Sequence, residues 1–285
     1  MKTYRVLIIL CLIFCLSIAG LAGGCSSENA TELKLVTSTS LIAQIVERIG
    51  GDHIDVVNII PPAQCPGHFD VKPGDIQKLS DAKLFLLHGW QGEKFSEELI
   101  TSANNPALTV VQINVKVGEN DNWMTPPVQQ AAVDKIADAL CQVDEANSSF
   151  YRDAAQDYKK IIDAKGSEIQ NKLATLNPAS ISVLCADQQP GFVSWAGFNI
   201  VAIYGRPDSL TPQVVKELVD KGKAGNVVLV IDNMQSGADA GAGIAEELGC
   251  ARVTLSNFPG GYDNTETWEK TIEYNIDLIS KALKE

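Results

Sequence analysis

The sequence predicts an α/β protein of two lobes, each a mostly parallel sheet flanked by helices, joined by one long rigid helix. Strand-like and helix-like segments alternate on both sides of the middle of the chain, and such strands pair in parallel through right-handed crossovers. An unbroken helical pattern covers Ser149–Leu176, roughly 40 Å at about 1.5 Å per residue, which is long enough to join two lobes. Val227–Ile231 reads Val-Val-Leu-Val-Ile, which is typical of a parallel strand buried on both faces.

Residues 33–127 are predicted to form the N-terminal α/β lobe. Its first helix, Ser38–Ile49, has apolar residues at three- and four-residue spacing and ends at Gly50-Gly51. The other expected elements of this lobe are strands at Leu33–Thr37, Ile54–Ile60, Leu84–His88 and Leu108–Ile113 and helices at Pro73–Leu79 and Gly92–Thr101.

Residues 128–176 are predicted to be a helical region that ends in the linking helix. It begins with an amphipathic helix at Val128–Val143, and Asn177-Pro178 ends the second helix because the residue before a proline disfavours helical geometry. Residues 177–285 then form the C-terminal α/β lobe, which leaves a cleft between the lobes. Its elements are expected as strands at Ile181–Cys185, Asn199–Tyr204, Val227–Ile231 and Arg252–Leu255 and helices at Gly191–Ala196, Pro212–Lys223, Ala238–Leu248 and Thr265–Leu283.

Residues 1–24 have the pattern of a secretory signal peptide. Lys2 and Arg5 precede the uncharged, mostly apolar Val6–Ala19, and small residues follow. Because Cys25 comes directly after them, the segment resembles a lipoprotein signal with Cys25 as the lipidated first residue, the alternative being an uncleaved membrane anchor. Residues 25–32 then form a lipid-anchored tether. Either way we expect an exported protein held on the outer face of the cell membrane, periplasmic or extracellular.

The net charge argues against one class of partner, and the cysteine content leaves disulfides possible. The formal net charge is -12 and no basic patch is visible, which argues against a nucleic-acid partner because phosphate neutralisation needs clustered lysine or arginine. Beyond Cys25 the chain has Cys65, Cys141, Cys185 and Cys250. An exported compartment permits disulfides, and the sequence alone does not choose among the pairings.

The segment Pro61–Asp75 is the first candidate site. Two prolines hold its start extended, and Cys65 and His68 flank Pro66-Gly67. Cys-x-x-His is a spacing that a single turn can aim at one point, and both side chains can bind a metal. The loop joins a strand to a helix, where open α/β sheets bind ligands. The alternative is a turn with a packed cysteine and a surface histidine.

Several landmarks together resemble the exported metal-binding subunits of ABC importers, of the zinc- and manganese-uptake type. They are Gly50-Gly51-Asp52, Pro61-Pro62, Phe69-Asp70, Pro73, Asp75, His88-Gly89-Trp90, Glu93, Trp123, Pro126, the linking helix and Tyr274-Asn275 with Leu278. The likeness covers about Leu33 to Leu283. It implies a two-lobe binding protein that takes a metal ion, with zinc favoured and manganese or another transition metal possible, and hands it to an ABC permease and its ATPase. We expect a monomer.

The ligand positions of that family are altered here. The family's histidine after the double proline falls at Gly67, with Cys65 and His68 on either side, and its second histidine falls at Asp121, two residues before Trp123. The third ligand falls near Ala186, between Cys185 and Asp187. The fourth, a carboxylate, has Asn257 as its nearest match.

Two interpretations of the cleft follow. In the first, Cys65, His68, Asp121 and either Cys185 or Asp187 form a substituted site, whose thiolates and imidazole suit zinc or another borderline-to-soft ion. In the second, the cleft holds a chelated metal or a small organic or oxyanion solute. The residues that would line the cleft are Trp90, Trp123, Asp232, Asn257 and Phe258. A Cys65–Cys185 disulfide would exclude the first interpretation.

Two other classes of function are weighed against binding and transport. Cys65 or Cys185 with His68 could be imagined as a nucleophile and base, but no orienting third group stands at a recognisable spacing, so we expect no enzyme. An adhesin or scaffold that uses the same two lobes is the remaining alternative.

Overall fold

The computed structural model describes residues 32–90, 93–119 and 121–284. The predicted signal peptide and Cys25 lie outside the described residues, as does almost all of the predicted tether. Residues 32–285 form one compact unit. No helix within the described ranges is both long enough and apolar enough to cross a membrane.

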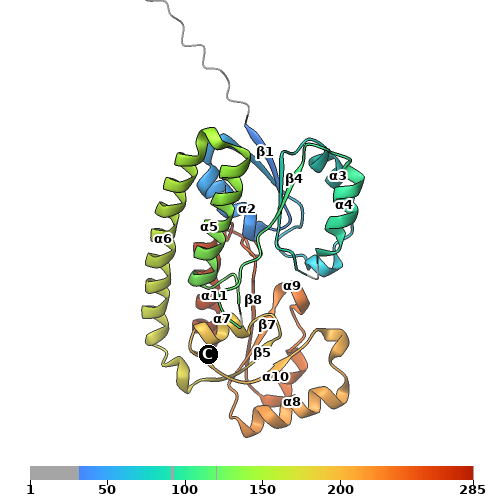
Figure 1. Ribbon diagram of the computed structural model, residues 1–285. Coiled ribbons are helices and arrows are strands. Elements are labelled where there is room, and N and C mark those ends of the chain that lie inside the picture. The colour runs from blue at the N-terminus through green and yellow to red at the C-terminus, as the bar shows by residue number, and fades with distance from the viewer. Residues whose placement is uncertain (1–31, 91–92, 120, 285) are drawn as a thin grey trace, which may run out of the picture. The chain divides into compact units, whose positions relative to one another are not determined.

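Two four-stranded parallel sheets form the framework of the protein (Figure 1). The first has the order β2-β1-β3-β4 and the second the order β6-β5-β7-β8, so the second half repeats the strand order of the first. The first sheet comprises β1 (Leu33–Thr37), β2 (Ile54–Asn58), β3 (Leu84–Leu87) and β4 (Thr109–Gln112). The second comprises β5 (Ser182–Ala186), β6 (Asn199–Tyr204), β7 (Leu229–Asn233) and β8 (Ala251–Leu255). The strand order reverses direction between β1 and β3 in the first sheet and between β5 and β7 in the second. Open α/β sheets bind ligands at the carboxyl ends of the strands beside such a reversal.

Helices cover both sheets. Those of the first half are α2 (Ser40–Gly50), α3 (Pro73–Ser80) and α4 (Phe95–Ala103), followed by α5 (Pro126–Val143) and α6 (Ser148–Ala174). The second half has α7 (Pro190–Trp195), α8 (Pro212–Ala224), α9 (Met234–Gly237), α10 (Ala242–Leu248) and α11 (Trp268–Ala282). Helix α6 is the predicted linking helix, and it runs alongside both sheets (Figure 1). The predicted two-sheet α/β fold with one long helix is therefore confirmed.

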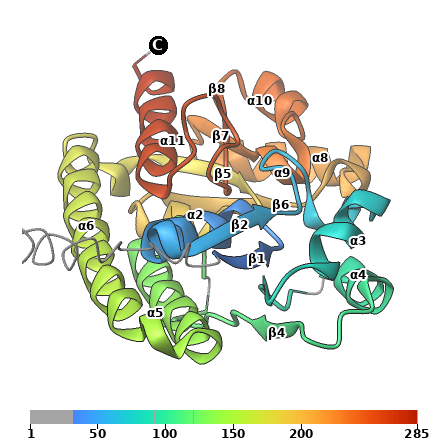
Figure 2. The same cartoon turned by 90° about the horizontal axis from the view of Figure 1, so that it is seen from above.

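One hydrophobic core is shared by the two halves. It combines Leu35 and Leu84 of the first sheet with Leu229 and Ile231 of the second, through apolar side chains of α2, α5, α6 and α11. Figure 2 shows α5, α6 and α11 together on one side of the molecule, with α3, α4 and α8 away from them. Two smaller clusters fill the space under α3 and α4 and under α8 and α10. The two halves are therefore held together along one side of the cleft by the packing of this shared core.

The helix predicted at Ala238–Leu248 begins later, as α10 at Ala242, and a separate short helix, α9, precedes it at Met234–Gly237. Gly237 has φ 149°, outside helical geometry, and the backbone N–H of Gly241 donates a hydrogen bond of 2.7 Å to the buried carboxylate of Asp232. This carboxylate also accepts hydrogen bonds from the Tyr204 hydroxyl and from the Arg252 guanidinium. The sequence pattern missed this later start because the group that holds Gly241 comes from the end of β7.

Candidate functional site

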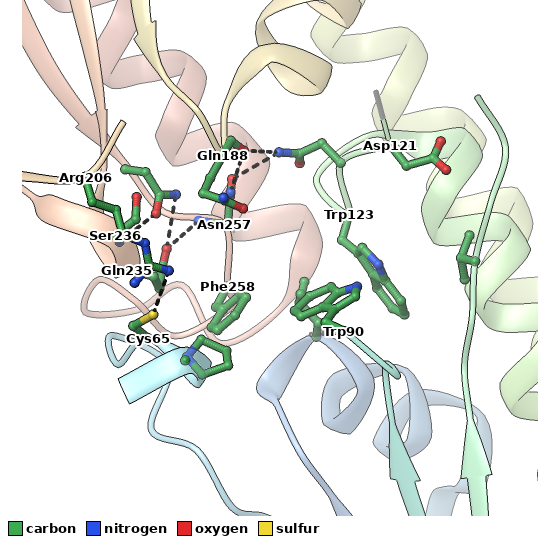
Figure 3. Close-up of a pocket in the computed structure, with 16 residues that line it drawn as sticks. Cys65, Trp90, Asp121, Trp123, Gln188, Arg206, Gln235, Ser236, Asn257 and Phe258 are labelled. Atoms are coloured by element: carbon green, nitrogen blue, oxygen red, sulfur yellow. Dashed lines mark hydrogen bonds between the residues drawn. The ribbon is translucent and has the colours of Figure 1, made fainter. Parts of the chain in front are cut away.

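A cavity of about 340 Å³ lies where the carboxyl ends of the two sheets face each other (Figure 3). The first half lines it with Leu41, Cys65, Pro66, Gly67, Trp90, Val115, Asp121, Asn122 and Trp123. The second half lines it with Gln188, Arg206, Asn233, Gln235, Ser236, Asn257 and Phe258. Several of these residues, such as Trp90, Gln188 and Arg206, closely follow a strand, and most of the others lie in the longer segments that connect a strand to the next helix, so the sheet topology places them together.

The Cys65 thiol and the His68 imidazole approach the same guanidinium across the cleft. A short turn of helix at Pro66–His68 begins with a proline and orients both side chains. Arg206, which follows β6, donates an Nη2–H to Cys65 Sγ over 3.2 Å, and its Nη1 lies 3.5 Å from His68 Nε2. Cys65 lines the cavity, whereas His68 stands exposed at its rim. The early loop thus meets a basic residue that our sequence analysis did not select.

Asp121, a predicted metal ligand, lines the cavity, but its own loop engages its carboxylate. The backbone N–H groups of Val117 and Gly118 donate to its two oxygens over 2.9 and 2.8 Å. These bonds direct both oxygens towards this exposed loop, so metal coordination by Asp121 would require its rearrangement.

The structure does not bring Cys185 and Asp187 into the cavity. Cys185 is fully buried in the shared core, and burial, together with the nearby Asp187 carboxylate, raises the pKa of its thiol to about 12. A metal binds the thiolate form, which this environment disfavours. Asp187 is exposed and is not among the lining residues. Both Cys65 and Cys185 are free thiols. Among the described residues, no group of three or more His, Cys, Asp or Glu side chains is arranged to hold a metal ion.

Of the residues predicted to line the cleft, Trp90, Trp123, Asn257 and Phe258 do so and Asp232 does not. Asp232 is fully buried beneath α10 and pairs with Arg252 over 2.7 Å. Figure 3 shows the three aromatic side chains on one side of the cavity and polar side chains such as Arg206 and Asn257 on the other.

Buried polar groups hold the aromatic side in place. The His88 ring stacks on Trp90 at 3.6 Å between centroids and meets Trp123 edge-on at 4.4 Å. Its Nε2 lies 2.7 Å from the Thr39 hydroxyl, and burial lowers the pKa of His88 well below its ordinary value. His88 is therefore a neutral support for Trp90 rather than a cation in the cleft.

Glu93 fixes the backbone that carries Trp90. Its carboxylate accepts hydrogen bonds from the backbone N–H groups of His88, Gly89 and Trp90, and from the Ser38 hydroxyl. Burial raises the pKa of Glu93, and these hydrogen bonds oppose that shift. Gly89 has φ 79°, a left-handed conformation that glycine adopts without steric cost.

A network of amides forms the polar side. Asn122 Nδ2 and Asn257 Nδ2 both donate to the Gln188 carbonyl oxygen, over 3.0 and 2.9 Å. Gln235 Nε2 donates to the Pro62 carbonyl oxygen over 2.8 Å, a bond between the two halves of the cleft. Asn122 and Gln188 were not predicted from the sequence, although Gln188 follows a predicted strand and that position was the available signal.

A cleft between two α/β halves joined by a long helix defines a binding protein that takes its ligand at the interface of the halves. The sequence model of the family described as "ZnuA: Zinc-uptake complex component A periplasmic" matches residues 35–282. The chain therefore belongs to this family.

Relatives and solved structures agree with this assignment. The chain is 23% identical over 300 residues to the manganese-binding lipoprotein MntA of Halalkalibacterium halodurans, covering 94% of this chain and 96% of that protein. The crystal structure of ZnuA superimposes with a TM-score of 0.75 at 19% identity, covering 88% of this chain and 99% of the other. The solute-binding protein FpvC of P. aeruginosa, in complex with Ni²⁺, gives 0.75 at 22% identity over 89% and 97%.

At these identities the structural matches establish the fold alone. The family match confirms the predicted resemblance to metal-binding subunits of ABC importers. It also places the chain among transporter binding proteins rather than enzymes.

Proposed function

We propose that this chain captures a transition metal in the cleft between its two α/β halves and delivers it to an ABC permease and its ATPase. The family to which the chain belongs is described as a component of a zinc-uptake complex. Relatives are named as binding proteins for manganese and iron. The observation that carries the proposal is the Cys65 thiol, which lines the cavity from the loop that follows Pro61-Pro62.

Cys65 and His68 are the proposed metal-binding pair. A thiolate and an imidazole suit zinc, and both accommodate other borderline ions. Asp121 is a third proposed ligand, available once its carboxylate leaves the backbone of its own loop. Trp90, Trp123, Asn257 and Phe258 enclose the cargo, and Cys185 and Asp187 are not part of this set.

Metal analysis of the protein purified without added metal tests the proposal. We expect zinc or another transition metal to accompany the wild-type protein. In the double variant Cys65→Ala/His68→Ala the affinity for cargo metal should fall on the order of a hundredfold or more, since even outer-shell changes cost about 10–100-fold. Far-UV circular dichroism should not change. Cys250→Ala, which removes a half-buried thiol outside the cavity, is the matched control. Unchanged affinity in the double variant would refute the pair.

The location of the protein is part of the same proposal. Residues 1–24 serve as the signal peptide, and Cys25 becomes the lipidated end of a tether, residues 25–32, on the outer face of the membrane. The lobes are residues 33–127 and 177–285, with the helical region 128–176 between them, and the protein works as a monomer. Mass spectrometry of the wild-type protein should detect a lipid on Cys25 that Cys25→Ala lacks. A wild-type Cys25 without lipid would contradict lipid anchoring.

A further inference from the structure

The cavity contains one cationic side chain that no carboxylate neutralises within the described parts of the chain. Arg206 contacts only the Cys65 sulfur and the His68 ring at its guanidinium nitrogens. Asp121 is the one carboxylate among the lining residues, and the backbone of Val117 and Gly118 engages it. The remaining polar lining groups are amides and the hydroxyl of Ser236.

This charge arrangement opposes a bare divalent cation. A metal ion bound to the Cys65 sulfur would lie close to the Arg206 guanidinium, which is 3.2 Å from the same atom. Like charges at such a distance repel, and the repulsion is stronger in a cleft than in bulk water because the effective dielectric constant is lower. A guanidinium presents donors in a planar fork that matches a carboxylate. An anionic group on the cargo would therefore convert this repulsion into a favourable contact.

The volume of the cavity and its apolar walls also favour a cargo larger than a bare ion. Its volume of about 340 Å³ is roughly tenfold the share of liquid volume that one water molecule occupies, about 30 Å³, and so is far larger than an ion needs. The ring of Trp90, which is exposed, offers apolar surface that a bare ion does not use, and the largely buried rings of Trp123 and Phe258 complete this wall of the cavity. Pockets that combine apolar walls with a few fixed polar groups are typical of small organic ligands.

We infer that the cargo metal enters the cleft as an anionic complex with a small carboxylate-bearing chelator. A carboxylate of the chelator pairs with Arg206, its carbon skeleton packs against Trp90 and Phe258, and the metal remains within reach of Cys65. This inference rests on the proposed metal-transport function and specifies the form in which the metal is bound.

Titration calorimetry on the compact unit of residues 32–285 with four probes tests the inference. The probes are zinc alone, the anionic zinc–citrate complex, the cationic zinc–bipyridine complex and citrate alone, with free zinc matched between the zinc samples. We expect zinc–citrate to bind at least about tenfold more tightly than zinc alone or zinc–bipyridine, since a charge-assisted pair is stronger than a neutral one.

Substitution of Arg206 should change the affinities for zinc–citrate and for zinc alone in opposite directions, which general damage to the fold would not do. In Arg206→Gln the affinity for zinc–citrate should fall roughly tenfold or more, while the affinity for zinc alone should rise, because the repulsion is removed. Arg152→Gln removes an equal charge from the exposed surface of α6 and should change neither affinity. Loss of both affinities in Arg206→Gln would overturn the inference.

The remaining outcomes separate this inference from the proposed function. If zinc alone binds wild-type protein as tightly as zinc–citrate, and this binding requires Cys65, the inference is wrong and the proposed function stands. If zinc–bipyridine matches zinc–citrate, the charge argument is wrong. If citrate alone binds as tightly as zinc–citrate, the metal contributes nothing and the inference is wrong. If zinc binds in none of its three forms, the proposed function fails as well.

Discussion

The carboxyl ends of the two sheets differ in chemistry although their strand order is the same. At the first sheet the side chains of Thr39, His88 and Glu93 are buried and are hydrogen-bonded within the same region. At the second sheet Arg206 and Asn257 remain partly exposed and line the cavity. The shared topology fixes where a ligand lies, and the residues after each strand fix which ligand it is. The first sheet supplies the rigidly supported Trp90, and the second supplies Phe258 and most of the polar recognition.

Among the substitutions that test this comparison, removal of the Glu93 carboxylate should lower the free energy of unfolding most. Glu93→Ala leaves three backbone N–H groups and the Ser38 hydroxyl without their acceptor. Each unsatisfied buried group costs about 1–3 kcal/mol, but the Gly89 and Trp90 N–H groups are only partly buried, so water can replace part of their bonding. We therefore expect a loss of about 2–4 kcal/mol in the free energy of unfolding. Urea denaturation measures it.

Glu97→Ala on the exposed side of α4 is the control for Glu93→Ala. Its free energy of unfolding should stay within about 0.5 kcal/mol of the wild-type value, as for most surface substitutions. Equal losses in the two variants would show that the first sheet has no rigid support at this point.

Asn257→Ala should weaken the second sheet's side of the cleft by a smaller amount. Its amide donates to the Gln188 carbonyl oxygen and accepts from Asn122 and Gln189. These groups are only partly buried, so water can replace some of the lost bonds, and we expect a loss of about 1–2 kcal/mol in urea denaturation. The affinity for cargo should fall more steeply than stability does. The reverse ranking would make Asn257 a structural residue of the second half.

His88 should make the first sheet sensitive to acid. Burial lowers the pKa of His88 in the folded state below its ordinary value of 6.5, so between these two pKa values the unfolded chain binds more protons than the folded chain. Stability contributed by neutral His88 is therefore fully present above about pH 6.5 and is lost as pH falls below it, by up to about 1.4 kcal/mol per pH unit.

A comparison of His88→Gln with the wild-type protein isolates this contribution. Glu93 lies close by with a raised pKa and acts in the opposite sense at lower pH, so only the difference between the two pH profiles is diagnostic. Urea denaturation from about pH 7.5 to about pH 5.5 should show a shallower fall in stability for His88→Gln than for the wild type. Parallel profiles would mean that His88 is not the group that titrates.

Trp90→Leu should give the smallest effect. The substitution keeps an apolar side chain but removes the ring stacked on His88, and such aromatic pairs contribute about 0.5–1.5 kcal/mol. Trp90 is 39% exposed, so we expect about 0.5 kcal/mol in stability and a few-fold loss of cargo affinity. Binding that is insensitive to this change would restrict recognition to the second sheet.

Element order was predictable because periodicity is a local property. The apolar run at Val227–Ile231 correctly indicated a central strand, and the pattern at Ser149–Leu176 indicated the long helix within two residues at each end. The helix expected to start at Gly92 begins at Phe95, after residues 91–92, which lie outside the described ranges.

The candidate site was less predictable because it depends on contacts distant in sequence. The proline loop directed attention to Cys65, which lines the cavity, yet its contact with Arg206 joins residues 141 positions apart. Cys185 stood at a strand end like the true lining residues, and the pleat turned its side chain into the core. The ends of strands therefore indicated which residues could line the cavity. Which of them do line it depends on side-chain direction, which alternates along a strand.

The shared hydrophobic core has a consequence for cargo release. Wide separation of the two halves would expose apolar side chains of α5, α6 and α11 that pack against both sheets, and each exposed large side chain would cost about 1.5–3 kcal/mol. Release is therefore expected through small local displacements. Such a movement would break contacts across the mouth, among them the bond between Gln235 and Pro62 and the contact between Arg206 and Cys65. A permease that unloads this protein would then act on the proline loop rather than pull two hinged halves apart.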